Sequence, residues 1–224
     1  MSKRALFVGG CPHSFHRLEE SAPPVTAALK AIGFEVNVSG VYHPDGGNDF
    51  TGDYAALSEA NLRTASVVVL HTTGNERREG DLQALKEYVQ AGGALVGIHC
   101  ATDSFKDDPE YIAMIGGSFR THPAQLDIQT EFVDHTHPIT AGLNDFKVHD
   151  ELYLFDNYLP ENVHLLAQTR SFDDNGPVPI AWVKEVGKGR VFYLSLGHNG
   201  STMADANWQK LFQNGVLWSV GALD

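Results

Sequence analysis

Histidines follow several short apolar segments of this sequence and are its strongest candidates for chemistry. An imidazole titrates near neutral pH, so it can exchange a proton with a substrate or bind a metal ion. His99 lies in GGALVGIHCATDSF, with Gly97 two residues before it and Ala101 two residues after it. This spacing is typical of a nucleophile elbow, a sharp turn that presents one side chain between small neighbours. The centre is normally Ser or Cys, but here it is His99, and Cys100 comes one residue later.

His99 could act as a general base, as a metal ligand, or as a hydrogen-bonding group that caps the next helix. We favour a functional role, because an elbow directs its central side chain into a cleft. His198, which ends an apolar segment in LGHN, is the best partner for it. Cys100 should point elsewhere as a buried, inert thiol, and Asp103 could equally cap or hydrogen-bond the elbow.

Glu151 is the best carboxylate candidate. It stands in HDELY, where Leu152 and Leu154 are apolar, and we expect it to lie within a strand. There it could orient a histidine, bind a metal or take a proton, or it could be one exposed position of an alternating strand. Asp150 and His149 are its close rivals.

A metal site is a minority interpretation of the eleven histidines. The sequence has neither the HExxH spacing of a zinc-binding helix nor a CxxC pair. A divalent metal could still be held by His16, His99, His122 and a carboxylate, although local spacing does not encode such a site. Gly9-Gly10 is followed by neither GxGxxG nor a Walker lysine, which gives nucleotide binding weak support.

The first half of the chain reads as alternating strands and helices. Residues 5–8 form a short apolar run and 34–38 an alternating one, with a helical pattern between them that starts at 21–24 and stops at Gly33. A β-α-β opening of this kind predicts a parallel sheet with a right-handed crossover. The further elements expected here are a helix at 54–62, a strand at 67–70, a helix at 82–89, a strand at 94–98 and a helix at 109–115.

The pattern changes after residue 125. Short strand-like segments at 126–133, 147–155 and 163–167 predict an antiparallel extension of roughly 125–170. Residues 179–184 and 190–196 flank Gly187-Lys188-Gly189, which indicates a hairpin, and 208–220 has the apolar face of a last helix.

Four predicted strand ends deliver polar groups to one edge of this sheet. They contribute His13 and His16, then 71–75, then 99–103, then His198. Ligands of open parallel sheets bind beyond the carboxyl ends of the strands. The convergence therefore predicts a site at this edge.

Bulk composition sets the wider expectations. At 224 residues and 42% hydrophobic content, the chain should form one domain over 1–224. A net charge of −12 argues against nucleic-acid and anionic membrane partners. Two cysteines and no membrane-length apolar stretch fit a reducing cytoplasm. A homodimer is expected only because homodimers are common.

Several segments together resemble the ThuA-like (trehalose utilization) family. They are the early GG-x-x-H-x-x-H loop, GGALVGIHCATDSF, YIAMIGGSFRTHP, HPITAGL with VHDELY, PIAWVKEVGKGRVFYLSLGHN and WQKLFQNGVLW. The resemblance implies an α/β fold like that of class I glutamine amidotransferases. This is a flavodoxin-like parallel sheet with helices on both faces and an antiparallel strand extension, and its active cleft lies at the elbow.

The resemblance also bears on the chemistry. In the related amidotransferases the elbow residue is a catalytic Cys, its partner His corresponds to His198, and a Glu follows two residues later. This chain has His99 at the elbow and Gly200 at the last position, so glutamine hydrolysis is not expected.

The family is linked to the use of trehalose and similar disaccharides through an oxidised 3-keto sugar. This implies His99 and His198 as an acid–base pair, with Glu151 orienting or ligating, and a metal or the 71–75 amides could hold an oxyanion. The residues expected to bind the sugar are His16, His71, Thr72, Asp103, His122 and Asp150. Two alternatives are a non-catalytic sugar-binding protein and a hydrolase or amidotransferase that depends on Cys100.

Overall fold

A computed structural model of the chain describes residues 3–10, 15–42, 51–52, 57–75, 80–170 and 176–224. Cys11, His13 and the start of the helix predicted at 54–62 lie outside these ranges. Among the described helices, none is long and apolar enough to cross a membrane.

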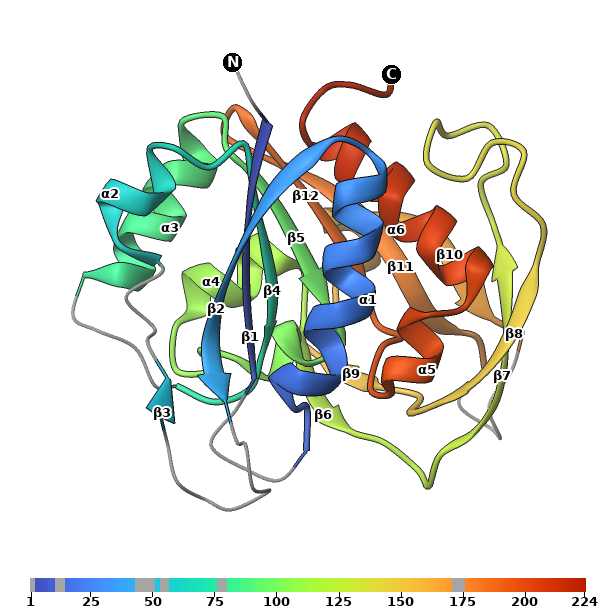
Figure 1. Ribbon diagram of the computed structural model, residues 1–224. Helices are drawn as coiled ribbons and strands as arrows, with labels where there is room; N and C mark the ends of the chain where they lie inside the picture. Colours follow the sequence, from blue (N-terminus) through green and yellow to red (C-terminus); the bar gives the residue numbers. More distant parts are fainter. Residues whose placement is uncertain (1–2, 11–14, 43–50, 53–56, 76–79, 171–175) are drawn as a thin grey trace.

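One ten-stranded sheet forms the centre of the fold, in the order β3-β2-β1-β4-β5-β12-β11-β10-β7-β8 (Figure 1). Its strands are β1 (Lys3–Gly10), β2 (Phe34–Tyr42), β3 (Thr51–Gly52), β4 (Val67–Thr72), β5 (Ala94–Ile98), β7 (Leu126–Phe132), β8 (Phe146–Asp150), β10 (His164–Thr169), β11 (Val178–Val186) and β12 (Gly189–Leu194). A separate antiparallel pair consists of β6 (Ser118–Thr121) and β9 (Leu154–Asp156).

Five of these strands are parallel neighbours: β2, β1, β4, β5 and β12. Numbered along the chain, they lie in the order 2-1-3-4-5, which is the flavodoxin-like arrangement. The predicted α/β class is therefore confirmed. Because the five strands run the same way, their carboxyl ends share one edge of the sheet.

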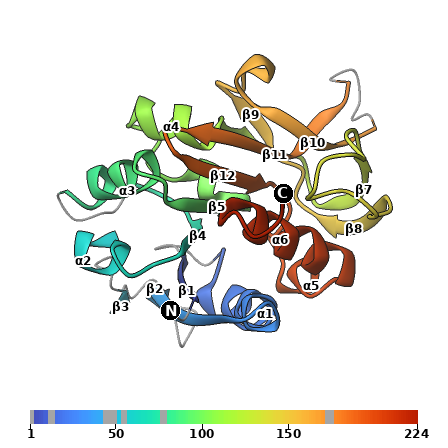
Figure 2. The same ribbon diagram turned by 90° about the horizontal axis from the view of Figure 1, so that it is seen from above.

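Helices cover both faces of the sheet (Figures 1 and 2). On one face lie α1 (Leu18–Ala31), α5 (Gly200–Met203) and α6 (Ala206–Ser219). On the other lie α2 (Glu59–Leu62), α3 (Asp81–Gln90) and α4 (Pro109–Ile115). Helix α1 begins at Leu18, three residues before the predicted start, because the Ser21 N–H already bonds the Arg17 carbonyl.

Two apolar cores result from the alternation of side chains along the strands. In β4, Val67 and Val69 pack toward α1 and α6, while Val68 and Leu70 pack toward α2 and α3. All four are fully buried. Burial of such a side chain stabilises the fold by roughly 1.5–3 kcal/mol, so the runs of valine and leucine in the sequence place β4 in the middle of the sheet.

The antiparallel half of the sheet lies beyond β12. The predicted hairpin is confirmed as β11–β12, and β10, β7 and β8 continue the antiparallel pairing. The strand predicted at 147–155 is wrong in one respect: β8 ends at Asp150 and β9 begins at Leu154. Glu151 therefore lies outside both strands, and its N–H bonds the Asp150 carboxylate rather than a neighbouring strand.

Gly215 offers a test of how tightly α6 packs on the sheet. A β-carbon at this position would overlap the ring of Phe192 in β12. We expect Gly215→Ala to lower the free energy of unfolding by about 1–3 kcal/mol, as overpacking does. Urea unfolding measures this, with the exposed Lys210→Ala in the same helix as control. A loss within about 0.5 kcal/mol of that control would contradict the packing described here.

Candidate active site

Four side chains from distant parts of the chain meet at the carboxyl ends of the parallel strands. His16 lies between β1 and α1, His99 directly follows β5, and His198 follows β12. Glu151 comes from the antiparallel half, directly after β8. Each offers one nitrogen or carboxylate oxygen, and the four atoms lie within 4.8 Å of one another. We call these four residues the His/Glu cluster.

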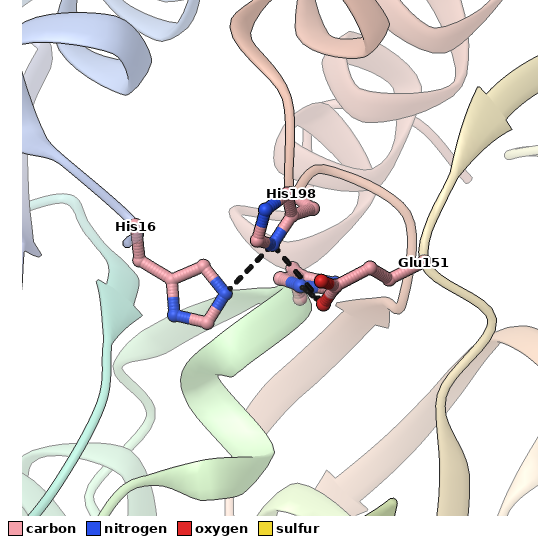
Figure 3. A group of neighbouring side chains, drawn as sticks. His16, Glu151 and His198 are labelled. Atoms are coloured by element: carbon pink, nitrogen blue, oxygen red, sulfur yellow. Dashed lines mark hydrogen bonds and ion pairs between the residues drawn. The ribbon is translucent and has the colours of Figure 1, made fainter. Parts of the chain in front are cut away.

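His198 lies between two other members of the cluster (Figure 3). Its Nδ1 is 3.1 Å from Glu151 Oε2 and 3.1 Å from His16 Nε2. His99 Nε2 is 3.4 Å from the same Glu151 oxygen. The arrangement can therefore exchange protons among its members or hold a metal ion.

His99 occupies the sharp turn that the sequence predicts. Strand β5 passes directly into a 3-10 helix, η2 (His99–Asp103), and His99 has a left-handed φ of 44°. Gly97 has no room for a β-carbon, which would lie 2.7 Å from Ile115 Cδ1. The small residue before the turn is thus required by packing.

The tautomer of His99 follows from its partner. Its Nδ1 is 2.6 Å from the Ser195 carbonyl oxygen, which only accepts, so Nδ1 carries a proton. Nε2 then points at Glu151, and it has no hydrogen-bond partner among the described residues. Because His99 is fully buried, this atom is also out of reach of bulk water.

His16 is also held in a left-handed conformation, with a φ of 53°. Its Nδ1 lies 2.7 Å from Thr73 Oγ1, which leaves Nε2 to face His198. Burial, followed by repulsion from the neighbouring histidines, lowers the pKa of His16 well below its ordinary value. The neutral imidazole is the form that can bind a metal or accept a proton.

Glu151 and His198 form a charged pair. Burial works to raise the pKa of Glu151, but its contacts with His198 and His99 outweigh burial and hold the pKa at about 2. For His198, burial works to lower the pKa, and the Glu151 carboxylate outweighs it and raises the pKa. The carboxylate is thus ionised at neutral pH beside an imidazole that holds its proton more tightly than usual.

Asp150 holds the backbones of Glu151 and His198 in place through hydrogen bonds. It is fully buried, and its carboxylate accepts hydrogen bonds from the backbone N–H groups of Glu151 (2.7 Å), Gly197 (2.9 Å) and His198 (3.0 Å). The sequence suggests that Asp150 contacts a sugar. The structure instead directs its carboxylate to the backbone, so it positions both Glu151 and His198.

His71 and Thr72, which the resemblance predicts as sugar contacts, form hydrogen bonds to neighbouring parts of the protein. His71 donates from Nε2 to the Gly197 carbonyl at 3.0 Å, and burial lowers its pKa to about 3. Thr72 Oγ1 lies 2.8 Å from Ser104 Oγ, which joins the end of β4 to the segment after η2. Both residues are buried in the described structure.

His122 lies at the outer side of the cluster. Its side chain is 36% exposed, and its Nε2 is 3.5 Å from Glu151 Oε2. The His198 side chain is 18% exposed, against 0% for His99. The cluster therefore meets solvent on the side of His122 and His198. Asp103 pairs with Lys106 in its own turn at 3.1 Å.

Tyr153 is part of the site although its sequence context resembles core. Its ring lies 3.8 Å, centroid to centroid, from the ring of His99, and its hydroxyl is 3.5 Å from His16 Nε2. Ser195 is not predicted from the sequence, and Thr73 is included only as part of the 71–75 segment. Only their places at strand ends could have pointed to them.

Cys100 is fully buried, as the sequence predicts, and it is not one of the four residues that meet in the cluster. Position 200, where the related amidotransferases carry an acid, packs against α1: a β-carbon on Gly200 would lie 2.8 Å from the Glu20 carbonyl oxygen. The thiol and the acid of a Cys-His-Glu triad are both absent from their places.

The three hydrogen bonds of Asp150 predict that Asp150→Asn lowers the stability of the protein. The amide keeps the size but turns one acceptor into a donor that faces a backbone N–H. We expect the free energy of unfolding to fall by about 1.5–3 kcal/mol, the value of hydrogen bonds to a charged group. Asp127→Asn, at an exposed ion pair with Lys147, is the control and should change it by less than about 1 kcal/mol. Equal urea midpoints for the two variants would contradict the bracing role.

Comparisons with known proteins agree with this fold. A putative ThuA-like protein from Parabacteroides merdae is 21% identical, with a TM-score of 0.82 over 100% of this chain and 92% of that chain. A second putative ThuA-like protein, from Bacteroides uniformis, is 20% identical, with a TM-score of 0.76 over 97% of this chain and 90% of that chain. A cytoplasmic protein from Salmonella typhimurium is 14% identical, with a TM-score of 0.63 over 96% of this chain and 98% of that chain.

At these identities the structural likenesses show the fold alone. A search of curated proteins found no match. The family model of ThuA, described as trehalose utilisation, matches residues 13–219. The chain therefore belongs to the ThuA family.

Proposed function

We propose that this protein is an enzyme of carbohydrate metabolism that acts on an oxidised, 3-keto form of trehalose or a related disaccharide. One observation carries the proposal. An ionised Glu151 contacts His198 at the strand-end edge of the sheet, in a chain of the trehalose utilisation family. A carboxylate and an imidazole in contact are the groups that general acid–base catalysis requires.

The chemistry of a keto sugar suits this pair. A carbonyl makes the hydrogen on the neighbouring carbon acidic, so a base can remove it while an acid protonates the departing oxygen or the enediolate. His198 and Glu151 lie on the side of the cluster that reaches solvent, so they are the groups that would exchange protons with the sugar. His99 is fully buried. We therefore propose that His99 does not contact the sugar but acts through Glu151.

His122 is the proposed sugar contact, because it is the most exposed of the histidines near Glu151. The thiol route has less support, since Cys100 is fully buried and is not among the residues of the cluster. A cytoplasmic location is part of the proposal. It is supported by the two-cysteine composition and by the similar fold of a Salmonella protein described as cytoplasmic.

Variants of the pair test the proposal. We expect Glu151→Gln and His198→Ala each to reduce turnover of 3-keto glucosides by about 10²–10⁴-fold, the usual contribution of a positioned acid or base. Product formation is measured by chromatography under saturating substrate. His164→Gln is the matched control, because His164 is an exposed histidine that pairs with Asp134.

Three outcomes would contradict the proposal. One is unchanged turnover in both His99→Ala and His198→Ala. Another is tight sugar binding by the unmodified protein with no product after prolonged incubation, which would favour a binding protein. The third is loss of activity on alkylation of Cys100, which would favour a thiol enzyme.

A further inference from the structure

We propose that the His/Glu cluster binds one divalent transition-metal ion of the Zn²⁺ class. The ligand atoms are His16 Nε2, His99 Nε2, His198 Nδ1 and Glu151 Oε2. This inference deepens the proposed function of the same site, and its catalytic meaning rests on that function, whereas the binding itself does not. With an ion bound, Glu151 Oε2 and His198 Nδ1, the latter having given up its proton, would be ligands, and the ion would supply the charge that stabilises the enediolate.

Three of the six separations in the cluster match the edges of a coordination shell. Ligands held about 2.0–2.1 Å from one ion, at angles from a right angle to tetrahedral, lie about 2.9–3.4 Å from one another. The three separations are 3.1 Å from His16 to His198, 3.1 Å from His198 to Glu151 and 3.4 Å from His99 to Glu151. All four atoms lie within 4.8 Å of one another, so an ion bound among them would draw the more distant side chains inward.

His99 supplies the second, independent observation. Its Nε2 is buried, directed into the cluster, and without a hydrogen-bond partner among the described residues. A buried polar atom without a partner costs about 1–3 kcal/mol. With the proton on Nδ1, Nε2 is the nitrogen that can bind an ion, and a cation between it and the Glu151 carboxylate satisfies both atoms.

The remote nitrogens of two ligands are also fixed. Metal-binding histidines usually use their other ring nitrogen to bond a carbonyl, a carboxylate or water, which sets the tautomer. His99 Nδ1 donates to the Ser195 carbonyl, and His16 Nδ1 bonds the Thr73 hydroxyl. Both Nε2 atoms are thereby presented to the centre of the cluster.

The ligand types select the ion. Three imidazoles and one carboxylate suit Zn²⁺, Fe²⁺, Co²⁺ or Ni²⁺, whereas Mg²⁺ and Ca²⁺ prefer oxygen ligands throughout. Three neutral imidazoles and one carboxylate carry a single negative charge, so a divalent ion leaves the centre positive. An ion with four protein ligands can accept a fifth when its coordination expands. A 3-keto sugar offers oxygen atoms for this purpose, in its carbonyl and in the hydroxyl on the next carbon.

Metal titration of the full-length protein tests the inference without any sugar. After treatment with a chelator and dialysis, Zn²⁺ is added in a calorimeter and Co²⁺ in a spectrophotometer. We expect one equivalent of each to bind, with Co²⁺ giving the visible absorption of a nitrogen- and oxygen-ligated ion. His99→Ala should weaken Zn²⁺ binding by more than about 100-fold, because loss of a ligand exceeds the loss of an outer-shell partner.

Thr73→Val is a second, milder variant, to be used if a ligand variant such as His99→Ala fails to fold. It keeps the shape of the side chain and removes only the hydroxyl that bonds His16. We expect an affinity lower by about 10–100-fold, as for other outer-shell partners. His164→Gln is the control for binding at surface histidines and should leave affinity and stoichiometry unchanged.

Two results would overturn the inference: no binding of Zn²⁺ or Co²⁺ by the stripped protein, or binding that is unaltered in both His99→Ala and Thr73→Val. Failure here is distinct from failure of the proposed function. Turnover of 3-keto glucosides by protein that binds no metal would remove the metal and keep the enzyme. One equivalent of metal lost in His99→Ala, with no turnover of any keto sugar, would keep the metal site and remove the sugar chemistry.

Discussion

The three hydrogen bonds of the Asp150 carboxylate are the interaction on which the site depends. They join the end of β8, in the antiparallel half of the sheet, to the loop that follows β12 in the parallel half. Glu151 and His198 belong to these two segments, and their contact exists because one buried carboxylate holds both backbones. Removing a buried charge from its partners is costly, so the junction resists opening.

The parallel half of the site could be predicted from sequence because sheet geometry is general. Any residue that directly follows a buried parallel strand must reach the same edge, which brings His99 and His198 together without knowledge of side chains. The turn at His99 could be predicted as well, from the small residue that packing requires at Gly97. Neither prediction needs more than local spacing.

The antiparallel half could not be predicted in the same way. Alternation around Glu151 indicates a continuous strand, yet the pairing ends at Asp150, whose carboxylate accepts the Glu151 N–H. Whether a buried polar side chain faces a substrate or a neighbouring backbone depends on tertiary contacts. For that reason the sequence alone suggests sugar contacts at Asp150, His71 and Thr72, whereas in the structure they brace the backbone or the end of β4. Tyr153 escapes sequence reasoning because a tyrosine between apolar residues resembles core.

Two members of the cluster, His16 and His99, have left-handed backbones. This conformation costs a residue other than glycine on the order of 1–3 kcal/mol, so it persists only where the surroundings impose it. Here the Thr73 hydroxyl and the Ser195 carbonyl fix the two rings. The contacts that impose the strained backbone therefore also fix the orientation of both imidazole rings within the cluster.

The close approach of Gly200 to α1 has a consequence for how this fold can change its chemistry. A Cys in place of His99 would restore the thiol of an amidotransferase, but an acid at position 200 would collide with the Glu20 carbonyl unless α1 moved. A single substitution at the elbow would therefore supply the thiol without its acid, because position 200 accepts a larger residue only if α1 shifts. The packing of α1 on Gly200 thus separates this chain from thiol chemistry by more than the identity of the residue at position 99.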